Sequence, residues 1–509
     1  MEKIIYEFDS SNASKIETTN DIFEGRTKIV ESLLSEREFD SEVTILVQLY
    51  NRLDKTKECI DSILKYTKDV NFDLLLIDNG STDDTFEYLK SIDYDKVRIM
   101  HINKNISSSY PVVHEEIKWF AKYLVVLAND MIVTPNWLSN LLTVAKSDER
   151  IGMVNPMSSN VSNGQCYDMK FTDFDDMQRQ AAEFNKSNPE KWDERIRLVT
   201  LGALYKKECL YAVGWPINDL GFFHDFIDDD ISFRVRRAGY KIVLAKDTWV
   251  HHNHDVFNCE TKDPVEYQKS LNTGRENFRT KFFGVDAWDD VNNYIPEFVS
   301  ALKTTSGKSA KILGIDVKCG TPILEIKNNI KKFGKYDTDC YAFTQNGKYF
   351  IDLQTVCGAE NVFSGNINSF KENFKEESLD YIVIGENINT YTEPFKIIKK
   401  AVSLLRNKGQ LFISLKNTND IFAFLNMLGN TNVYSEKFAT NYTAEAFFNK
   451  LNSMGYKVEF LGSARYTPKD VPQNFLDATT SAVSKLSLKD EQEILFRLVS
   501  DKYLFAISK

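Results

Sequence analysis

Short apolar runs rich in β-branched residues alternate with segments of helical periodicity from residue 43 onward. The first four runs cover residues 43–50, 74–78, 97–102 and 123–130. Strands that alternate with helices form βαβ units and a mostly parallel sheet, because parallel neighbours need a crossover connection. We therefore expect an α/β fold whose ligands bind at the carboxyl ends of the strands.

The same pattern returns in the second half of the chain. Apolar runs at residues 311–317, 341–343, 379–385, 410–417 and 455–462 alternate with further helical stretches. At 509 residues the chain is long enough for two large domains, each with its own core. The expected organisation is an N-terminal extension, a first α/β domain, a helical connector and a second α/β domain, at residues 1–40, 41–258, 259–308 and 309–509.

The charge balance excludes two classes of partner. The chain has 63 Lys and Arg against 73 Asp and Glu, so its formal net charge is −10. Nucleic acids and anionic membranes need a basic surface, which this composition does not supply. The apolar runs also stay far below the roughly 20 residues of a membrane-spanning helix, and the first residues lack the basic-then-apolar order of a signal peptide. We expect a cytoplasmic protein with no membrane span and no nucleic-acid partner.

The residues that end the first two strands are the first candidate ligand contacts. Leu49, Tyr50 and Asn51 end one strand, and Asp78 and Asn79 end the next. A strand-end aspartate can accept hydrogen bonds from a uracil imide or a ribose hydroxyl. The Ser-Thr-Asp run that follows can equally cap the next helix, in which case the motif is only a capped turn.

The fourth apolar run ends at Asn129 and Asp130. A carboxylate at the end of a buried strand must be paired, hydrated or bound to a metal. Mn²⁺ and Mg²⁺ favour carboxylates together with phosphate oxygens, so Asp130 suits a metal that also holds a diphosphate. A solvated strand-end carboxylate is the alternative.

Three consecutive acids, Asp228, Asp229 and Asp230, precede a helical stretch. The helix dipole explains one acid at a helix N-terminus, but three exceed that need. Clustered carboxylates raise one another's pKa, so one of them can act as general base toward an acceptor hydroxyl.

All six histidines lie in the first half of the chain, and three of them, His251, His252 and His254, fall within four residues after a strand. This density favours at least one contact to a metal or a phosphate. Strand alternation would place His252 and His254 on one face and His251 on the other, and the sequence does not decide which face points inward. The candidate metal ligands are Asp130, His251 and His252.

Four segments in this order, VQLYN, IDNGSTDDT, VLANDMIVTPNWL and DDDISFRVRRAGYKIVLAKDTWVHH, resemble the motifs of the family 2 inverting glycosyltransferases with the GT-A fold. The resemblance covers about residues 41–258. It implies that Asp78 binds the nucleotide base, that Asp130 binds a divalent metal and the donor diphosphate, and that His251 contacts the metal or the diphosphate. Ala128 stands where the family's metal motif has its first acid.

The resemblance also implies a single in-line displacement with inversion at the anomeric carbon. The family's general base maps onto Asp228, with Asp229 as the close rival and Asp230 at the start of the helix motif. The implied donor is a UDP-sugar held with Mn²⁺ or Mg²⁺, and UDP-GlcNAc is the preferred candidate.

Residues 309–509 resemble a class I S-adenosylmethionine methyltransferase, which has a Rossmann-like α/β fold. The likeness rests on LDYIVIGENINTYTEPFKIIKKAVSLLRNKGQLFISLKN and FATNYTAEAFFNKLNSMGYKVEFLG. The glycine-rich turn after the first strand keeps only Gly320, and the second strand lacks the acid that ends it in the family. We expect a degenerate domain that binds no S-adenosylmethionine and docks an acceptor or a partner; an active methyltransferase is the alternative.

Proteins that join these two domain types resemble those of surface-polysaccharide and flagellin modification. The expected acceptor is therefore a Ser or Thr hydroxyl of a protein such as flagellin. Extension of a surface polysaccharide or another glycan is the enzymatic alternative. A non-catalytic scaffold that binds sugar nucleotides is the alternative without catalysis.

Overall fold

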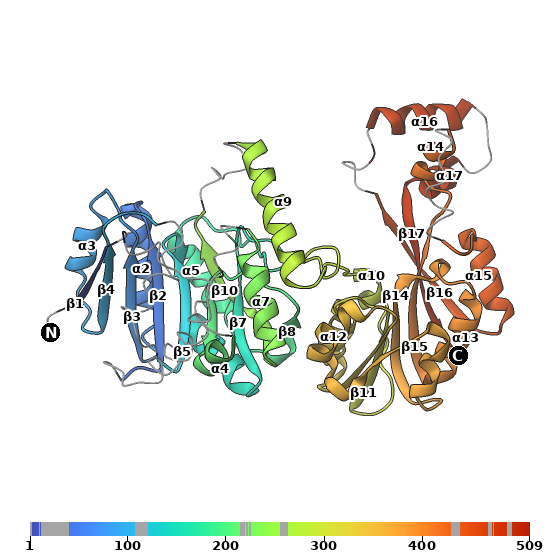
Figure 1. Cartoon of the computed structure of the whole chain (residues 1–509), viewed down its shortest axis with the longest axis horizontal. Helices are drawn as coiled ribbons and strands as arrows, with labels where there is room; N and C mark the ends of the chain where they lie inside the picture. Colours follow the sequence, from blue (N-terminus) through green and yellow to red (C-terminus); the bar gives the residue numbers. More distant parts are fainter. Residues whose placement is uncertain are drawn as a thin grey trace. The chain divides into compact units, whose positions relative to one another are not determined.

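The computed structural model describes residues 3–9, 11, 40–106, 121–213, 219, 222, 225–254, 263–428, 438–466, 471, 473–485 and 491–509. Two compact units divide the chain, the N-terminal unit Met1–Trp288 and the C-terminal unit Asp289–Lys509 (Figure 1). Each unit has its own sheet. The division falls within residues 259–308, where the connector is expected, and most of residues 1–40 lie outside the described part of the chain.

The N-terminal unit is built on one sheet of mixed strand direction. Its strands, in order along the sheet, are β1 (Ile4–Phe8), β4 (Val97–Ile102), β3 (Phe72–Asp78), β2 (Val43–Leu49), β5 (Tyr123–Ala128), β9 (Ala203–Lys206), β7 (Ile151–Ser158), β10 (Lys241–His252) and β6 (Met131–Ile132), and β8 (Trp192–Arg195) also pairs with β10. Neighbours from β1 to β5 are parallel, β9 is antiparallel to both of its neighbours, and β7 and β10 are parallel. The carboxyl ends of β2, β3, β5, β7 and β10 therefore lie at one edge of the sheet, where α/β folds bind ligands.

Strand β1 belongs to the segment in which we expect only an N-terminal extension. Ile4 to Phe8 pair in parallel with Arg98 to Ile102 of β4. Five residues with no repeated pattern around them carry too little periodicity to be recognised as a strand. The pairing with β4, far along the chain, is what makes them part of the sheet.

Helices cover both faces of this sheet. One face carries α2 (Leu53–Tyr66), α3 (Thr85–Ser91) and α4 (Trp137–Ser147), and the other carries α5 (Phe174–Phe184), α6 (Lys207–Val213) and α7 (Ile227–Arg237). Adjacent residues of β3 belong to different cores, since Leu76 packs with the first set of helices and Ile77 with the second. Burial on both faces explains why these strands read as unbroken apolar runs.

A further helix, α9 (Pro264–Lys281), packs against the start of α7. The ring of Phe278 meets that of Phe233 edge to face, with centroids 5.0 Å apart. Gly274 lies so close to Phe226 that a Cβ atom on it would stand 2.8 Å from the ring carbon Cδ2. These aromatic contacts hold the N-terminus of α7, which carries the three consecutive acids.

The C-terminal unit contains a second sheet. Its strand order is β13 (Val362–Ser364), β12 (Asp337–Thr344), β11 (Ser309–Ile315), β14 (Leu379–Asn387), β15 (Leu405–Lys416), β17 (Ser500–Ser508) and β16 (Lys457–Arg465). Strands β13 to β15 are parallel, and β17 is antiparallel to both of its neighbours. Each apolar run expected as a strand in this half contributes to one of these strands. The strand order reverses between β11 and β14, and such switch points are where doubly wound sheets bind ligands.

Helices of the C-terminal unit fall into two groups. Its helices are α10 (Pro296–Ser300), α11 (Thr321–Asn329), α12 (Phe350–Cys357), α13 (Pro394–Leu404), α14 (Ile421–Leu428), α15 (Ala444–Ser453), α16 (Gln473–Lys485) and α17 (Glu491–Val499). Figure 1 shows α14, α16 and α17 gathered beyond one end of β17, away from the helices that cover the sheet. We call α14, α16 and α17 the helical lobe. Across the described residues of the whole chain, no helix is long and apolar enough to cross a membrane.

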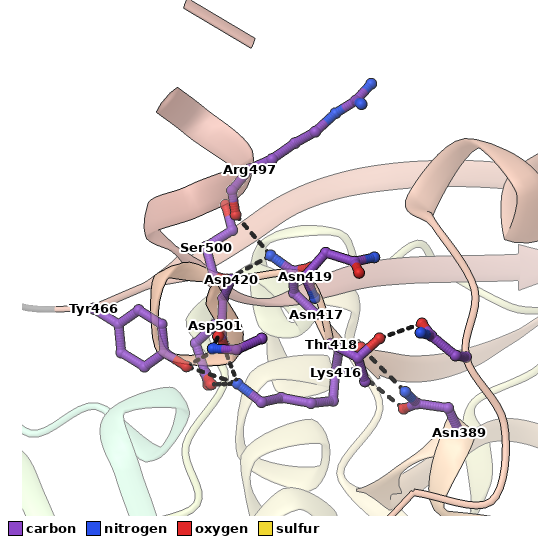
Figure 2. A network of polar contacts seen from close by, with 12 residues as sticks. Asn389, Lys416, Asn417, Thr418, Asn419, Asp420, Tyr466, Arg497, Ser500 and Asp501 are labelled. Atoms are coloured by element: carbon purple, nitrogen blue, oxygen red, sulfur yellow. Dashed lines mark hydrogen bonds and ion pairs between the residues drawn. The ribbon is translucent and has the colours of Figure 1, made fainter. Parts of the chain in front are cut away.

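One buried ion cluster joins the helical lobe to the sheet (Figure 2). Lys416, at the end of β15, donates hydrogen bonds of 2.7 Å each to Asp420, Tyr466 and Asp501. These partners come from the start of α14, the end of β16 and the start of β17. The cluster therefore ties together the chain segments that lead into and out of the helical lobe.

Candidate active site

The turn between β2 and α2 connects three of the strand ends. Asn51 and Arg52 both have positive φ angles, 53° and 63°, which asparagine tolerates better than most residues. The Asn51 side-chain oxygen accepts a 2.7 Å bond from the Thr82 backbone, and its backbone N–H donates to Ser81 Oγ at 2.9 Å. Asn129 Nδ2 donates to the Asn51 carbonyl at 3.1 Å. The ends of β2, β3 and β5 are thus held as one unit.

The remaining strand-end residues lie beside this turn. The backbone N–H of Asn79 donates to the Leu49 carbonyl at 2.9 Å, which continues the pairing of β2 with β3. The Asn79 side-chain oxygen accepts from the Ile106 backbone at 3.1 Å. Tyr50 is 44% exposed, so its ring is available to a ligand at this edge.

Asp78 is fully buried at the end of β3. Its Oδ2 lies 2.8 Å from His101 Nδ1, and its Oδ1 accepts from the Ser81 backbone at 3.2 Å. The His101 ring stacks on Phe86 with centroids 3.9 Å apart. Since the His101 side chain is partly exposed and that of Asp78 is fully buried, a ligand at this edge would meet the imidazole before the carboxylate.

Asp130 gathers basic side chains from two directions. Its carboxylate lies 3.5 Å from Arg52, 3.6 Å from His252 Nε2 and 3.6 Å from His254 Nδ1. One ligand atom from each of Asp130, His252 and His254 can be chosen so that all lie within 4.8 Å of one another. These three residues are hereafter the Asp-His-His cluster.

The charge of Asp130 is incompletely compensated. The residue is 8% exposed, and among the described residues its Oδ1 has no hydrogen-bond partner. Burial by itself would raise the pKa of the Asp130 carboxyl, but the neighbouring histidines and Arg52 hold this pKa below its ordinary value. A buried, ionised carboxylate beside two imidazoles is a donor set that suits a divalent metal. The cluster therefore fits the metal that the sequence motifs imply.

His251 does not join the Asp-His-His cluster, although we expect it there from the sequence. Its Nδ1 lies 2.8 Å from Ser159 Oγ, and its ring stacks on Trp249 with centroids 5.8 Å apart. Burial lowers the pKa of His251 to about 4, so the ring is neutral. Successive side chains of β10 point to opposite faces, which separates His251 from His252 and leaves His254 to take its place beside Asp130.

Asp228 stands at the N-terminus of α7 and is half-buried. Its Oδ1 accepts hydrogen bonds from the Thr200 backbone, at 3.0 Å, and from the Thr200 hydroxyl. Gly202 lies two residues after Thr200 in the same loop, and a Cβ atom on it would stand 3.3 Å from Pro156 and 3.5 Å from Met131. Because Met131 follows Asp130 directly, this loop places Asp228 at the same end of the sheet as the cluster.

The other two acids of the run are engaged in ion pairs. Asp229 is 4% exposed and its Oδ1 lies 2.7 Å from Arg197 Nε. Burial raises the pKa of Asp229 to about 7, although Arg197 acts in the opposite direction. Asp230 is fully buried between Arg234 and Lys281, at 2.8 and 2.5 Å. Of the three acids, Asp228 alone is neither fully buried nor ion-paired.

Three residues at this edge are not among those predicted from the sequence: Arg52, His101 and His254. The i, i+2 spacing of His252 and His254 is the one signal that could have pointed to His254, because alternate residues of a strand share a face. Arg52 and His101 lie within ordinary sequence, and only strand pairing brings them to Asp130 and Asp78.

Comparison with known proteins shows which family this part of the chain resembles. Residues 44–206 match the family model "Glycosyl transferase family 2". An O-antigen biosynthesis protein, RfbC of Myxococcus xanthus, is 31% identical over 115 residues, or 21% of this chain and 9% of that protein. An uncharacterized glycosyltransferase of Rickettsia bellii is 32% identical over 100 residues, or 19% of this chain and 14% of that protein. Residues 44–206 of the N-terminal unit are thus similar to the family 2 glycosyltransferases, and the chain spans only a small part of these relatives' length.

Solved structures give a more distant likeness. A crystal structure of GalNAc-T7 with UDP, GalNAc and Mn²⁺ matches with a TM-score of 0.36 and 12% identity, covering 52% of this chain and 58% of that one. A mannosyltransferase of Pyrobaculum calidifontis in complex with GDP-Man and Mn²⁺ matches with a TM-score of 0.32 and 14% identity, covering 52% and 83%. Both TM-scores are too low to establish a shared fold.

Proposed function

We propose that the N-terminal unit is a metal-dependent inverting glycosyltransferase of the GT-A type, which transfers a sugar from a nucleoside diphosphate donor to a hydroxyl group. The observation that carries this proposal is the Asp-His-His cluster at the carboxyl edge of the sheet. Asp130 lies within the segment that matches the family 2 glycosyltransferase model, and both histidines follow that segment in the chain. A carboxylate and two imidazoles at this edge suit a divalent metal, Mn²⁺ or Mg²⁺ in the family. When bound, such a metal supplies charge neutralisation for the departing diphosphate.

The donor in this proposal is a UDP-sugar. The pair of Asp78 and His101 at the end of β3 supplies hydrogen-bonding groups for a uracil or a ribose. Tyr50 is exposed next to Asn51 and can flank the base. Asn51 and Asn129 hold the strand ends in place and orient this half of the site. UDP-GlcNAc is the first donor to test.

Asp228 is the general base in this mechanism. It is the most accessible of the three acids, and the Thr200 hydroxyl and backbone fix its carboxylate. An acceptor hydroxyl beside it would lose its proton to Asp228 as its oxygen attacks the anomeric carbon from the side opposite the diphosphate. The attack inverts the configuration at that carbon, and no covalent link between sugar and enzyme forms. Asp229 is the weaker candidate because Arg197 and the protein interior enclose it.

The proposed acceptor is a Ser or Thr hydroxyl of a protein such as flagellin. A second candidate is the extension of a surface polysaccharide, which the name of the Myxococcus xanthus relative, an O-antigen biosynthesis protein, favours. Product analysis with each class of acceptor separates these two reactions.

We further propose that the C-terminal unit is a methyltransferase-like domain that binds no S-adenosylmethionine. Asp316, directly after β11, accepts hydrogen bonds from the Gln345 backbone and side chain at 2.8 and 3.0 Å, and from the Tyr391 hydroxyl at 2.8 Å. The polar groups at the ends of β11 and β12 are therefore bonded to one another. Titration calorimetry with S-adenosylmethionine tests this proposal, and micromolar binding would overturn it.

A hydrolysis and transfer screen tests the main proposal. The full chain is incubated with UDP- and GDP-sugars, with Mn²⁺ and after chelation, and release of the nucleoside diphosphate is measured. We expect turnover of at least one UDP-sugar that is lost after chelation and in Asp130→Ala. A folded protein with no turnover across the whole panel would favour a sugar-nucleotide-binding scaffold.

A further inference from the structure

We infer that the outer edge of β1 pairs with β1 of a second copy of this chain, so that two N-terminal sheets join across a two-fold axis. Strand β1 is the outermost strand at one end of this sheet, beside β4 (Figure 1). Among the described residues, no strand pairs with its other edge. Such an edge is a template for another strand, and two-fold dimers are the commonest oligomers. The inference does not depend on the proposed function.

The hydrogen bonds of β1 show which of its residues face outward. The Phe8 carbonyl accepts a hydrogen bond of 3.2 Å from the N–H of Asn103, directly after β4, so Phe8 faces β4. In an extended strand the N–H and C=O groups of one residue point to the same side, and those of the next residue point to the opposite side. Tyr6 therefore faces β4 as well, and the backbone groups of Ile5 and Glu7 face away from the sheet.

The strands that end the two sheets elsewhere are protected in ways that β1 is not. β6 has two residues and β13 has three. β16 is longer, but its pairing with β17 shifts register between Phe460 and Gly462, and it carries Lys457, Glu459 and Arg465. Short strands, bulges and charged side chains all discourage edge pairing. β1 has five residues in unbroken register with β4, and it contains a single charged side chain.

The sequence around β1 is complementary to itself in one antiparallel register. In this register Ile5 lies opposite Ile5 of the second copy. Ile4 then lies opposite Tyr6. Lys3, directly before the strand, lies opposite Glu7. Each cross-strand pair is therefore either apolar or oppositely charged, which stabilises a sheet, whereas registers that place Glu7 opposite itself or opposite Ile5 lose this match.

The side chains that this pairing needs are accessible. Ile5 is 40% exposed, and Glu7 is exposed as well. The Lys3 ammonium donates one hydrogen bond of 2.8 Å to the Lys90 carbonyl, and an ammonium has two further donors for a carboxylate. Two Ile5 side chains that meet at the axis would remove apolar surface from water. Because a five-residue strand buries little area, we expect a weak dimer that dissociates on dilution.

Sedimentation equilibrium of the full chain at roughly 1–100 µM tests the inference. We expect the average mass to rise with concentration from that of a monomer toward that of a dimer. A monomer across the whole range, the result expected if another segment of this chain occupies the edge, would overturn the inference. Assembly beyond the dimer would also contradict it, because pairing across a two-fold axis is closed.

Proline variants separate pairing at the edge from folding of the strand. Ile5→Pro removes an N–H that faces outward and keeps the hydrogen bonds to β4, and edge strands tolerate proline in this orientation. We expect Ile5→Pro to weaken the dimer at least tenfold and to leave thermal unfolding close to that of the wild type. Tyr6→Pro is the contrasting variant, because it removes an N–H that faces β4 and should destabilise the strand. A dimer that persists unchanged in Ile5→Pro would show that the copies associate elsewhere.

Two further tests define the register. Glu7→Lys should weaken the dimer because it brings like charges opposite each other, and adding Lys3→Glu to it should restore the dimer; failure to restore it would refute the Lys3–Glu7 pairs. Ile5→Cys should form a disulfide with the second copy under mild oxidation, because directly opposed Cα atoms lie about 5.5 Å apart. The wild type, in which Cys166 is exposed, gives the background. No cross-link above this background would refute the two-fold pairing at Ile5.

Discussion

The guanidinium of Arg52 lies 3.5 Å from the carboxylate of Asp130, so a positive charge already faces the proposed metal ligand. The Arg52 side chain is 36% exposed and extends from a residue with positive φ at the start of α2. A cation in this position competes with a metal for Asp130 and would attract a diphosphate once the metal is bound. The charge of Arg52 should therefore weaken metal binding and strengthen diphosphate binding.

Arg52→Gln is expected to tighten Mn²⁺ binding in the absence of nucleotide and to weaken UDP binding in the presence of Mn²⁺. Exposed ion pairs contribute about 0.2–1 kcal/mol, which corresponds to at most about a fivefold gain in Mn²⁺ affinity. Calorimetric titration of each ligand measures both effects. Weaker Mn²⁺ binding in Arg52→Gln would show that the arginine supports the metal site instead of competing with it.

Asp228→Asn should lower sugar transfer by at least ~100-fold, because a general base contributes about two to four orders of magnitude to a rate. The amide keeps the shape of the side chain and lies apart from the Asp-His-His cluster, so Mn²⁺ and UDP binding should be unchanged. Asp61→Asn, on the exposed side of α2, is the matched control. Near-normal transfer in Asp228→Asn would remove this residue from the role of base and direct attention to Asp229.

The buried acid Asp229 predicts a pH dependence of stability. Its pKa in the folded protein, about 7, lies above the ordinary value of 3.8, so between these pH values the folded state binds more protons than the unfolded state. The contribution of Asp229 to stability is therefore greatest at low pH and is lost as the pH rises through 7. Arg197, Asp228 and Asp230 are the charged groups that surround it.

Denaturant unfolding of the wild type and of Asp229→Asn at pH 5, 6, 7 and 8 tests this dependence. The free energy of unfolding of the wild type minus that of the variant should fall as the pH rises. The test uses the change of this difference with pH and not its absolute size, because the variant also loses the ion pair with Arg197. Glu266→Gln on the exposed side of α9 should follow the wild type at every pH. A difference that stays constant with pH would contradict the raised pKa.

The ion cluster at the end of β15 predicts a local loss of stability. Lys416→Met removes a cation from Asp420, which is fully buried, and breaking one half of a buried pair costs about 3–5 kcal/mol. Hydrogen exchange should speed up in α14, α16 and α17 because their attachment to the sheet is weakened. Lys396→Met, an exposed lysine of α13, is the control. Unchanged exchange in the helical lobe of Lys416→Met would show that other contacts hold it.

Much of the fold could be predicted because its signals are local. The apolar runs at 74–78 and 123–130 correspond to β3 and β5, since strands buried on both faces carry unbroken apolar sequence. The helix after Pro135 is α4, as its apolar spacing indicates. β1 could not be predicted, because its five residues become a strand only through pairing with β4.

The sequence predicted which chain segments form the site, but it did not predict which side chains contact one another there. The sequence places Asp78, Asp130 and the histidine run at strand ends, and the parallel sheet brings those ends together. Which histidines lie beside Asp130 depends on the face of the sheet to which each side chain of β10 points. The structure places His254 beside Asp130, where the motif predicts His251.

By itself the sequence determined an α/β protein of two sheets, with acids and histidines at strand ends and a series of motifs in the first half that resembles the family 2 glycosyltransferases. The alternation of strands and helices and the strand-end positions follow from periodicity and spacing, which are local. Only the tertiary structure decided that Asp228 is more accessible than Asp229, that Arg52 and His101 lie beside acids, and that His252 and His254 share Asp130. Each of these depends on strand register and helix packing, which bring together residues that are distant in sequence.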